Sequence, residues 1–142
     1  MKLEHVALLV AEPVAMARWY EEHLGMRVVR SGEPPANARF LADDEGRSVL
    51  EIYAGTPPLP PYASMDPLVL HVAFAPDDVG ATRARLIAAG ATAVGEVVVT
   101  PGGDQFAMLR DPWGLALQLA RRARPLVGAR KAVPESGSER CD

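Results

Sequence analysis

The segment Leu68-Val69-Leu70-His71-Val72-Ala73-Phe74 decides the fold, because the chain carries a similar segment, Leu3-Glu4-His5-Val6-Ala7-Leu8, near its start. Both segments are rich in residues that favour strands and are too short for a helix, which predicts strands over 3–10 and 68–74. Each predicted strand contains one histidine. A histidine inside an apolar strand must be hydrogen-bonded or hold a ligand.

The similarity extends beyond the histidines and divides the chain into two equivalent halves. His71 follows His5 by 66 residues, and Gln118 follows Glu51 by 67 residues. Each half has a strand, an amphipathic segment closed by glycine, and three further strands, so each predicts the order β-α-β-β-β. The four polar residues that interrupt apolar strands therefore form two matching pairs, His5 with His71 and Glu51 with Gln118.

The length of 142 residues fits one domain with a substantial core. We expect a first module over 1–54, a proline-rich, stiff linker over 55–67, and a second module over 68–122. Within the modules, the pattern predicts one helix that starts at Pro13 and ends at Gly25, and another that starts at Asp77 or Asp78 and ends at Gly90. Residues 123–142 are expected to form a polar, partly disordered tail.

Composition excludes several kinds of partner. Charged residues make up 23% of the chain and the net charge is −3, with no basic run in the body, so neither nucleic acid nor an anionic membrane is expected as a partner. The apolar runs are only as long as strands, so we expect neither a membrane-spanning helix nor a signal peptide. The single cysteine, Cys141, cannot form an internal disulfide, and a cytoplasmic location is expected.

The paired polar residues suggest a metal site on physical grounds. If the halves pack with a pseudo-twofold relation, His5, His71, Glu51 and Gln118 can point at one position. Burying the Glu51 carboxylate ionised and alone would cost several kcal/mol, and a divalent cation would reverse that cost. Two imidazoles and one carboxylate leave coordination positions open for substrate or water, and an amide oxygen can serve as a weaker fourth ligand. Each residue also has a purely structural alternative, as a core histidine, a solvated edge glutamate or a glutamine that bridges backbone groups.

The element order, the duplicated unit and the polar residues on the first and last strands resemble the vicinal oxygen chelate superfamily over residues 1–122. That superfamily includes glyoxalase I, extradiol dioxygenases, methylmalonyl-CoA epimerase, and the fosfomycin and bleomycin resistance proteins. The resemblance implies an α+β fold in which two βαβββ modules form a cupped mixed sheet with the helices outside. It also implies one divalent metal ion (Zn, Ni, Co, Mn or Fe), held by His5, Glu51, His71 and Gln118, and a homodimer.

The resemblance further implies a small substrate whose two neighbouring oxygens chelate the metal. Glyoxalase I and the epimerase carry a glutamate at the position of Gln118, and an amide cannot transfer a proton at ordinary pH. Glu51 would then serve as both ligand and catalytic base. The leading hypothesis is therefore a glyoxalase-like isomerase or lyase.

Two alternatives remain open at this stage. One is a non-haem Fe(II) extradiol-type dioxygenase that uses His5, His71 and Glu51. The other is a non-enzymatic antibiotic-binding or resistance protein that sequesters a small molecule without a metal.

Three further residues are weaker candidates for contact with substrate. Tyr53 lies two residues beyond Glu51, hence on the same strand face. Tyr62, in the linker, could reach over a pocket mouth, and Arg110 could bind an anionic substrate near the rim. Packing in the core or on the surface is the structural alternative for the tyrosines.

Overall fold

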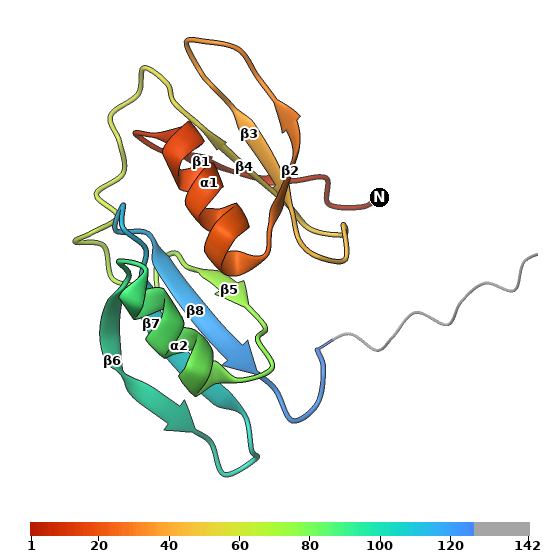
Figure 1. Ribbon diagram of the computed structural model, residues 1–142, viewed down its shortest axis with the longest axis vertical. Helices are drawn as coiled ribbons and strands as arrows, with labels where there is room; N and C mark the ends of the chain where they lie inside the picture. Colours follow the sequence, from red (N-terminus) through yellow and green to blue (C-terminus); the bar gives the residue numbers. More distant parts are fainter. Residues whose placement is uncertain (127–142) are drawn as a thin grey trace, which may run out of the picture.

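The computed structural model describes residues 1–126 and contains the two predicted βαβββ modules (Figure 1). Each module has a four-stranded sheet, with the strand orders β1-β4-β3-β2 and β5-β8-β7-β6. The first and last strands of each module pair in parallel, and the other neighbours are antiparallel. The first module consists of β1 (Val6–Leu9), α1 (Pro13–Leu24), β2 (Arg27–Ser31), β3 (Arg39–Ala42) and β4 (Val49–Tyr53). The second consists of β5 (Val72–Phe74), α2 (Val79–Ala88), β6 (Thr92–Val99), β7 (Gln105–Arg110) and β8 (Ala116–Arg121).

The helix ends follow the predicted signals. Helix α1 begins at Pro13 and is closed by Gly25, whose φ of 70° is the left-handed conformation that glycine adopts without strain. Helix α2 is capped by Asp78, whose side chain accepts a hydrogen bond from the Ala81 N–H at 2.8 Å.

The histidine-bearing strands are shorter than the sequence predicts, and that part of the prediction is wrong. Strands were expected over 3–10 and 68–74, whereas β1 begins at Val6 and β5 begins at Val72. In the second module the cause is a turn at Asp66, whose side chain accepts from the Leu68 N–H at 2.9 Å while its carbonyl accepts from the Val69 N–H. An aspartate that bonds the backbone two residues on competes with strand pairing. Each histidine therefore lies one residue before its strand.

The register makes the two modules equivalent at the level of single residues. Ala7 pairs with Glu51 across β1 and β4, and Ala73 pairs with Gln118 across β5 and β8. Since strand side chains alternate in direction, each pairing places the polar residue on the same sheet face as the histidine two positions earlier. The strand pairing therefore relates His5 to Glu51 in the same way as it relates His71 to Gln118, as the predicted symmetry requires.

Each sheet has one face packed against its helix and one face opposite it. Leu50 and Ile52 on β4 are buried in one cluster with Met16 and Tyr20 of α1. Glu51 alternates with Leu50 and Ile52, so it lies on the opposite face. We call this side of the first sheet its open face. On β8, Gln118 alternates in the same way with the buried Leu117 and Leu119 and lies on the open face of the second sheet.

Helix α1 ties the two modules together. The indole Nε1 of Trp19 donates to the Ala89 carbonyl oxygen at 2.9 Å, and the Tyr20 hydroxyl donates to Asp111 at 2.8 Å. Leu115 and Leu117 of the second module join the core cluster of the first. The modules therefore share a core, and α1 lies beside the second module in the ribbon view (Figure 1).

The structure bears on the expected tail and on the expected lack of a membrane-spanning helix. The expected disordered tail falls mostly on residues 127–142, which lie outside the described part of the chain. Neither helix within residues 1–126 is long and apolar enough to cross a membrane.

Candidate functional site

Two of the predicted ligands meet on the open face of the first sheet. His5 Nε2 lies 3.1 Å from Glu51 Oε2, and the two side chains are 34% and 19% exposed. His5 directly precedes edge strand β1, and Glu51 lies in the neighbouring strand β4. The Phe40 ring, which lies beside Glu51 on β3, packs edge-on against the imidazole with the ring centroids 5.7 Å apart.

The other ring nitrogen of His5 is held by a carboxylate. His5 Nδ1 contacts a side-chain oxygen of Glu4. This hydrogen bond, together with the negative charges of Glu4 and Glu51, outweighs the loss of hydration and raises the pKa of His5 above its ordinary value. The imidazole lies between two carboxylates, and Nε2 can bind a ligand only once the proton that it shares with Glu51 is lost.

The second module presents its histidine with the same nitrogen occupied. His71 Nδ1 lies 2.8 Å from the Pro67 carbonyl oxygen, so it donates its proton there and leaves Nε2 free. The turn at Asp66 that shortens β5 also places the Pro67 carbonyl in this position. Gln118, opposite Ala73, is partly buried.

The four residues do not assemble within one chain as the structure describes it. Among residues 1–126, no group of three or more His, Cys, Asp or Glu side chains lies close enough to hold a metal ion. His5 and Glu51 are in contact on the first sheet. His71 and Gln118 belong to the second sheet. Both histidines border edge strands, because β1 and β5 each end the strand order of their sheet. No ladder joins the two sheets over the described residues.

Of the three weaker candidates, Tyr53 shares the face of Glu51, whereas Tyr62 and Arg110 are engaged elsewhere. Tyr53 is partly buried on β4, on the face of Glu51. Tyr62 donates its hydroxyl to the Leu9 carbonyl oxygen at 2.9 Å and packs against the core. Arg110 donates to three backbone carbonyl oxygens, those of Tyr62 and Met65 in the linker at 2.7 Å each, and that of Gly114 at 3.0 Å.

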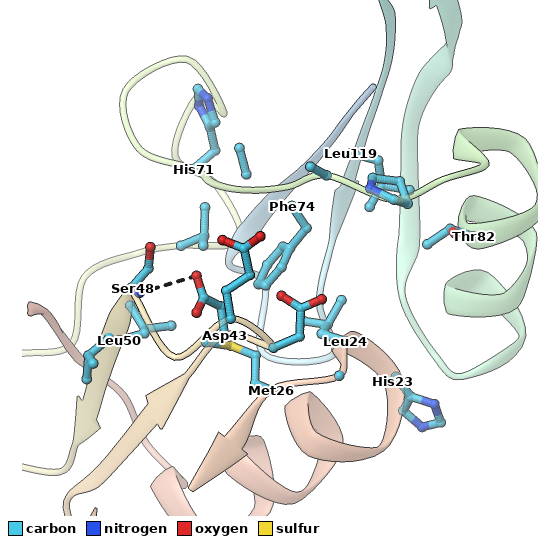
Figure 2. A pocket seen from close by; sticks show the side chains of 18 of the residues that line it. His23, Leu24, Met26, Asp43, Ser48, Leu50, His71, Phe74, Thr82 and Leu119 are labelled. Carbon is cyan, nitrogen blue, oxygen red and sulfur yellow. Dashed lines mark hydrogen bonds between the residues drawn. The ribbon is translucent and has the colours of Figure 1, made fainter. Parts of the chain in front are cut away.

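A large cleft lies between the modules, on the side of the first sheet opposite Glu51. Its volume is about 1030 Å³, and neither His5 nor Glu51 lines it, whereas His71 lies at its edge (Figure 2). Its apolar lining includes Leu50 and Phe74 from different modules. Acidic residues also line the cleft, among them Asp43. Burial raises the pKa of Asp43, but hydrogen bonds from the backbone N–H groups of residues 46–48 outweigh burial and lower the pKa below its ordinary value.

Sequence reasoning missed two residues on the open face of the first sheet. Phe40 and Arg30 are aligned beside Glu51 in adjacent strands. In 39–42 the apolar residues are consecutive and both Leu41 and Ala42 are buried, so no alternation marked the side of Phe40. A register irregularity between Val28 and Arg30 interrupts the period of two in β2, so the side of Arg30 could not be read from spacing.

Comparison with known families shows where the chain belongs. A sequence model of the Glyoxalase/Bleomycin resistance protein/Dioxygenase superfamily matches residues 2–119. The chain belongs to this superfamily. Members of the superfamily bind small molecules, often dimerise and often use a divalent metal. A comparison with curated proteins gave no match.

Several solved structures share the fold. The crystal structure of SMU.1112c is 30% identical with a TM-score of 0.67, and the match covers 85% of this chain and 98% of that one. A glyoxalase family protein from Bacillus cereus is 20% identical with a TM-score of 0.68, over 85% and 95% of the two chains. TnmS3, an antibiotic-binding protein from Streptomyces sp. CB03234, is 24% identical with a TM-score of 0.64, over 87% and 99%. The last two likenesses concern the fold alone.

Proposed function

We propose that this superfamily member is a divalent-metal-dependent enzyme, a glyoxalase-like isomerase or lyase whose small substrate chelates the metal through two neighbouring oxygens. One observation carries the proposal: His5 and His71 both have Nδ1 engaged by an oxygen acceptor, so Nε2 is the nitrogen of each that can bind a metal, and in His5 it faces the Glu51 carboxylate, a second potential ligand. Metal-binding histidines in proteins almost always show this arrangement, because the outer hydrogen bond fixes the tautomer and the ring orientation.

The donor set fits a divalent transition metal. Neutral imidazole suits zinc, nickel, cobalt and iron, and a carboxylate adds a negative ligand that lowers the net charge of the site. Glu51 Oε2 lies 3.1 Å from His5 Nε2, so the two side chains could bind one ion together. Gln118, at the equivalent position of the second module, can add only a neutral amide oxygen.

A homodimer would bring the two half-sites together. The strands beside the histidines, β1 and β5, are sheet edges within residues 1–126, and unpaired edges readily pair with another chain. Exposed apolar side chains precede both strands, with Leu3 78% exposed and Leu68 80% exposed. Placing β1 of one copy beside β5 of its partner would join their sheets and set His5 and Glu51 opposite His71 and Gln118 of the partner. A twofold axis would create two such sites.

Within such a site, the chain's residues divide the chemistry between them. A bound divalent ion would supply Lewis acidity to a substrate carbonyl. Glu51 is the residue able to take the proton from the carbon next to that carbonyl, because Gln118 cannot accept it at ordinary pH. Returning the same proton from the Glu51 carboxyl to the neighbouring carbon, while the substrate's hydroxyl proton moves to the former carbonyl oxygen, would complete an isomerisation in which one C–H and one O–H bond are broken and one of each is formed.

The test of this function is proton exchange at carbon. Metal-loaded wild type, incubated in deuterated water with a panel of small α-hydroxy ketones, should exchange the hydrogen next to the carbonyl of at least one compound. Glu51→Gln should lose this exchange, and Glu45→Gln, an exposed hairpin glutamate, should retain it. Exchange that survives in Glu51→Gln would contradict the proposed base.

A second candidate is metal-free binding of an aromatic small molecule between two copies. It is favoured by the aromatic surface that Phe40 and Tyr53 add to the open face, and by the lack of a three-residue ligand group within residues 1–126. Elemental analysis of the purified protein separates the candidates, because this second function predicts full ligand binding without metal. Iron with oxygen uptake on a catechol would instead indicate the dioxygenase chemistry.

A further inference from the structure

Arg30 shares the open face of the first sheet with the His5–Glu51 pair. Across three adjacent strands, Arg30 on β2 pairs with Phe40 on β3, which pairs with Glu51 on β4. Paired residues of neighbouring strands point to the same face. Neighbouring strands are about 4.8 Å apart, so the β2 backbone at Arg30 lies roughly 10 Å from β4 at Glu51.

The guanidinium of Arg30 is directed along this row. Its central carbon lies 5.8 Å from the centroid of the Phe40 ring, within the range of a cation–π contact. The same ring packs against His5. Phe40 thus forms an apolar surface between the candidate metal ligands and a cation.

The charge of Arg30 has no carboxylate partner within 4.0 Å in the described part of the chain. The second sheet offers an internal comparison, because Arg122 also lies over a ring, that of Phe106, at 5.1 Å. Arg122, however, is paired with Asp104 at 3.5 Å. Arg30 is exposed and keeps its donors for another group.

We propose that Arg30 binds a carboxylate on the substrate, at the end opposite the two chelating oxygens. This inference rests on the function proposed above and narrows its substrate class. The substrate would carry two neighbouring oxygens at one end, an apolar or aromatic middle that lies over Phe40, and an anionic group near β2. A guanidinium is suited to the anionic group because it presents paired donors in the geometry of a carboxylate.

Two matched probes test the proposal. Dihydrocaffeate and dihydrocaffeamide both chelate through a catechol, and they differ in that only the first has a remote carboxylate. Titration calorimetry would measure the Kd of each probe with zinc-loaded wild type and with the Arg30→Gln and Arg18→Gln variants. Arg18 is an exposed arginine of α1 and serves as the control for loss of one positive charge.

We expect wild type and Arg18→Gln to bind dihydrocaffeate about tenfold more tightly than the amide, a difference of about 1.4 kcal/mol. Arg30→Gln should lose this preference while its zinc content and its Kd for the amide stay unchanged. If wild type binds zinc but shows no preference for dihydrocaffeate, or if the preference persists in Arg30→Gln, the proposed role of Arg30 is overturned. The proposed function would still stand in either case. Absence of zinc binding by wild type would overturn the proposed function and this inference with it.

Discussion

The Tyr20 hydroxyl donates a hydrogen bond of 2.8 Å to Asp111 Oδ2, and this contact joins two buried residues that lie 91 positions apart in different modules. The other oxygen of Asp111 accepts from the backbone N–H groups of Trp113 and Leu115. Asp111 thereby fixes both the turn before β8 and the position of α1. With the Trp19–Ala89 hydrogen bond and the shared core, this contact holds the two sheets in their relative placement.

Removing the hydroxyl should destabilise the whole chain. Tyr20→Phe leaves a buried carboxylate oxygen without its partner, which should lower the free energy of unfolding by about 1–3 kcal/mol. Tyr53→Phe is the control, since the Tyr53 hydroxyl has no hydrogen-bond partner within residues 1–126. Urea unfolding measures both variants. Equal effects of the two substitutions would show that the contact with Asp111 contributes nothing.

The ionisation of Asp111 should oppose folding at neutral pH. Burial outweighs the hydrogen bonds that Asp111 accepts and raises its pKa above the ordinary value of 3.8. The folded state therefore binds this proton more tightly, so the stabilising contribution is complete below the unfolded pKa and is lost as the pH rises through the folded pKa. Measured between pH 3 and 7, the free energy of unfolding of wild type minus that of Asp111→Asn should fall as the pH rises. A difference that rises with pH would contradict the raised pKa.

The packing of the linker against the second module should be disrupted by any side chain at Gly114, which lies beside Ala63 of the linker. A Cβ there would lie 2.7 Å from the Ala63 Cβ and 2.9 Å from the Ala63 backbone, and the φ of 89° is already unfavourable for other residues. Gly46 has a φ of 68° but open space around it, which makes it a matched control for backbone strain without a clash. Strain of this kind costs about 1–3 kcal/mol. Gly114→Ala should therefore lower the free energy of unfolding by more than Gly46→Ala, and equal losses would count against close packing of the linker.

Much of the fold could be predicted because the sequence contains the same structural unit twice. The repeat of histidine, glycine-closed helix and final polar strand predicted both βαβββ modules, and Pro13 and Asp78 mark the helix starts at which the structure places them. The short β5 was missed because a local signal, the Asp66 side chain, competes with strand-forming residues that follow it. Contacts between distant residues, such as Tyr20 with Asp111, leave no periodic trace in the sequence.

The candidate site was predictable only in part, for a physical reason. The repeat predicted that His5, His71, Glu51 and Gln118 could point at one position, and within one chain the structure places only His5 and Glu51 in contact. Spacing could not show on which side of β2 Arg30 lies, because a register irregularity interrupts the alternation there. The assembly of both half-sites depends on how sheet edges meet, which a pattern within one chain does not encode.

The central claim is that one copy supplies His5 and Glu51 while its partner supplies His71 and Gln118. The most direct test co-expresses His5→Ala and His71→Ala chains with different affinity tags, isolates the mixed dimer by both tags, and measures its metal content by elemental analysis beside wild type. Each variant alone should lack metal, whereas the mixed dimer should hold about half the wild-type amount, because one of its two sites is intact. A mixed dimer without metal, beside a metal-containing wild type, would contradict a site shared between copies.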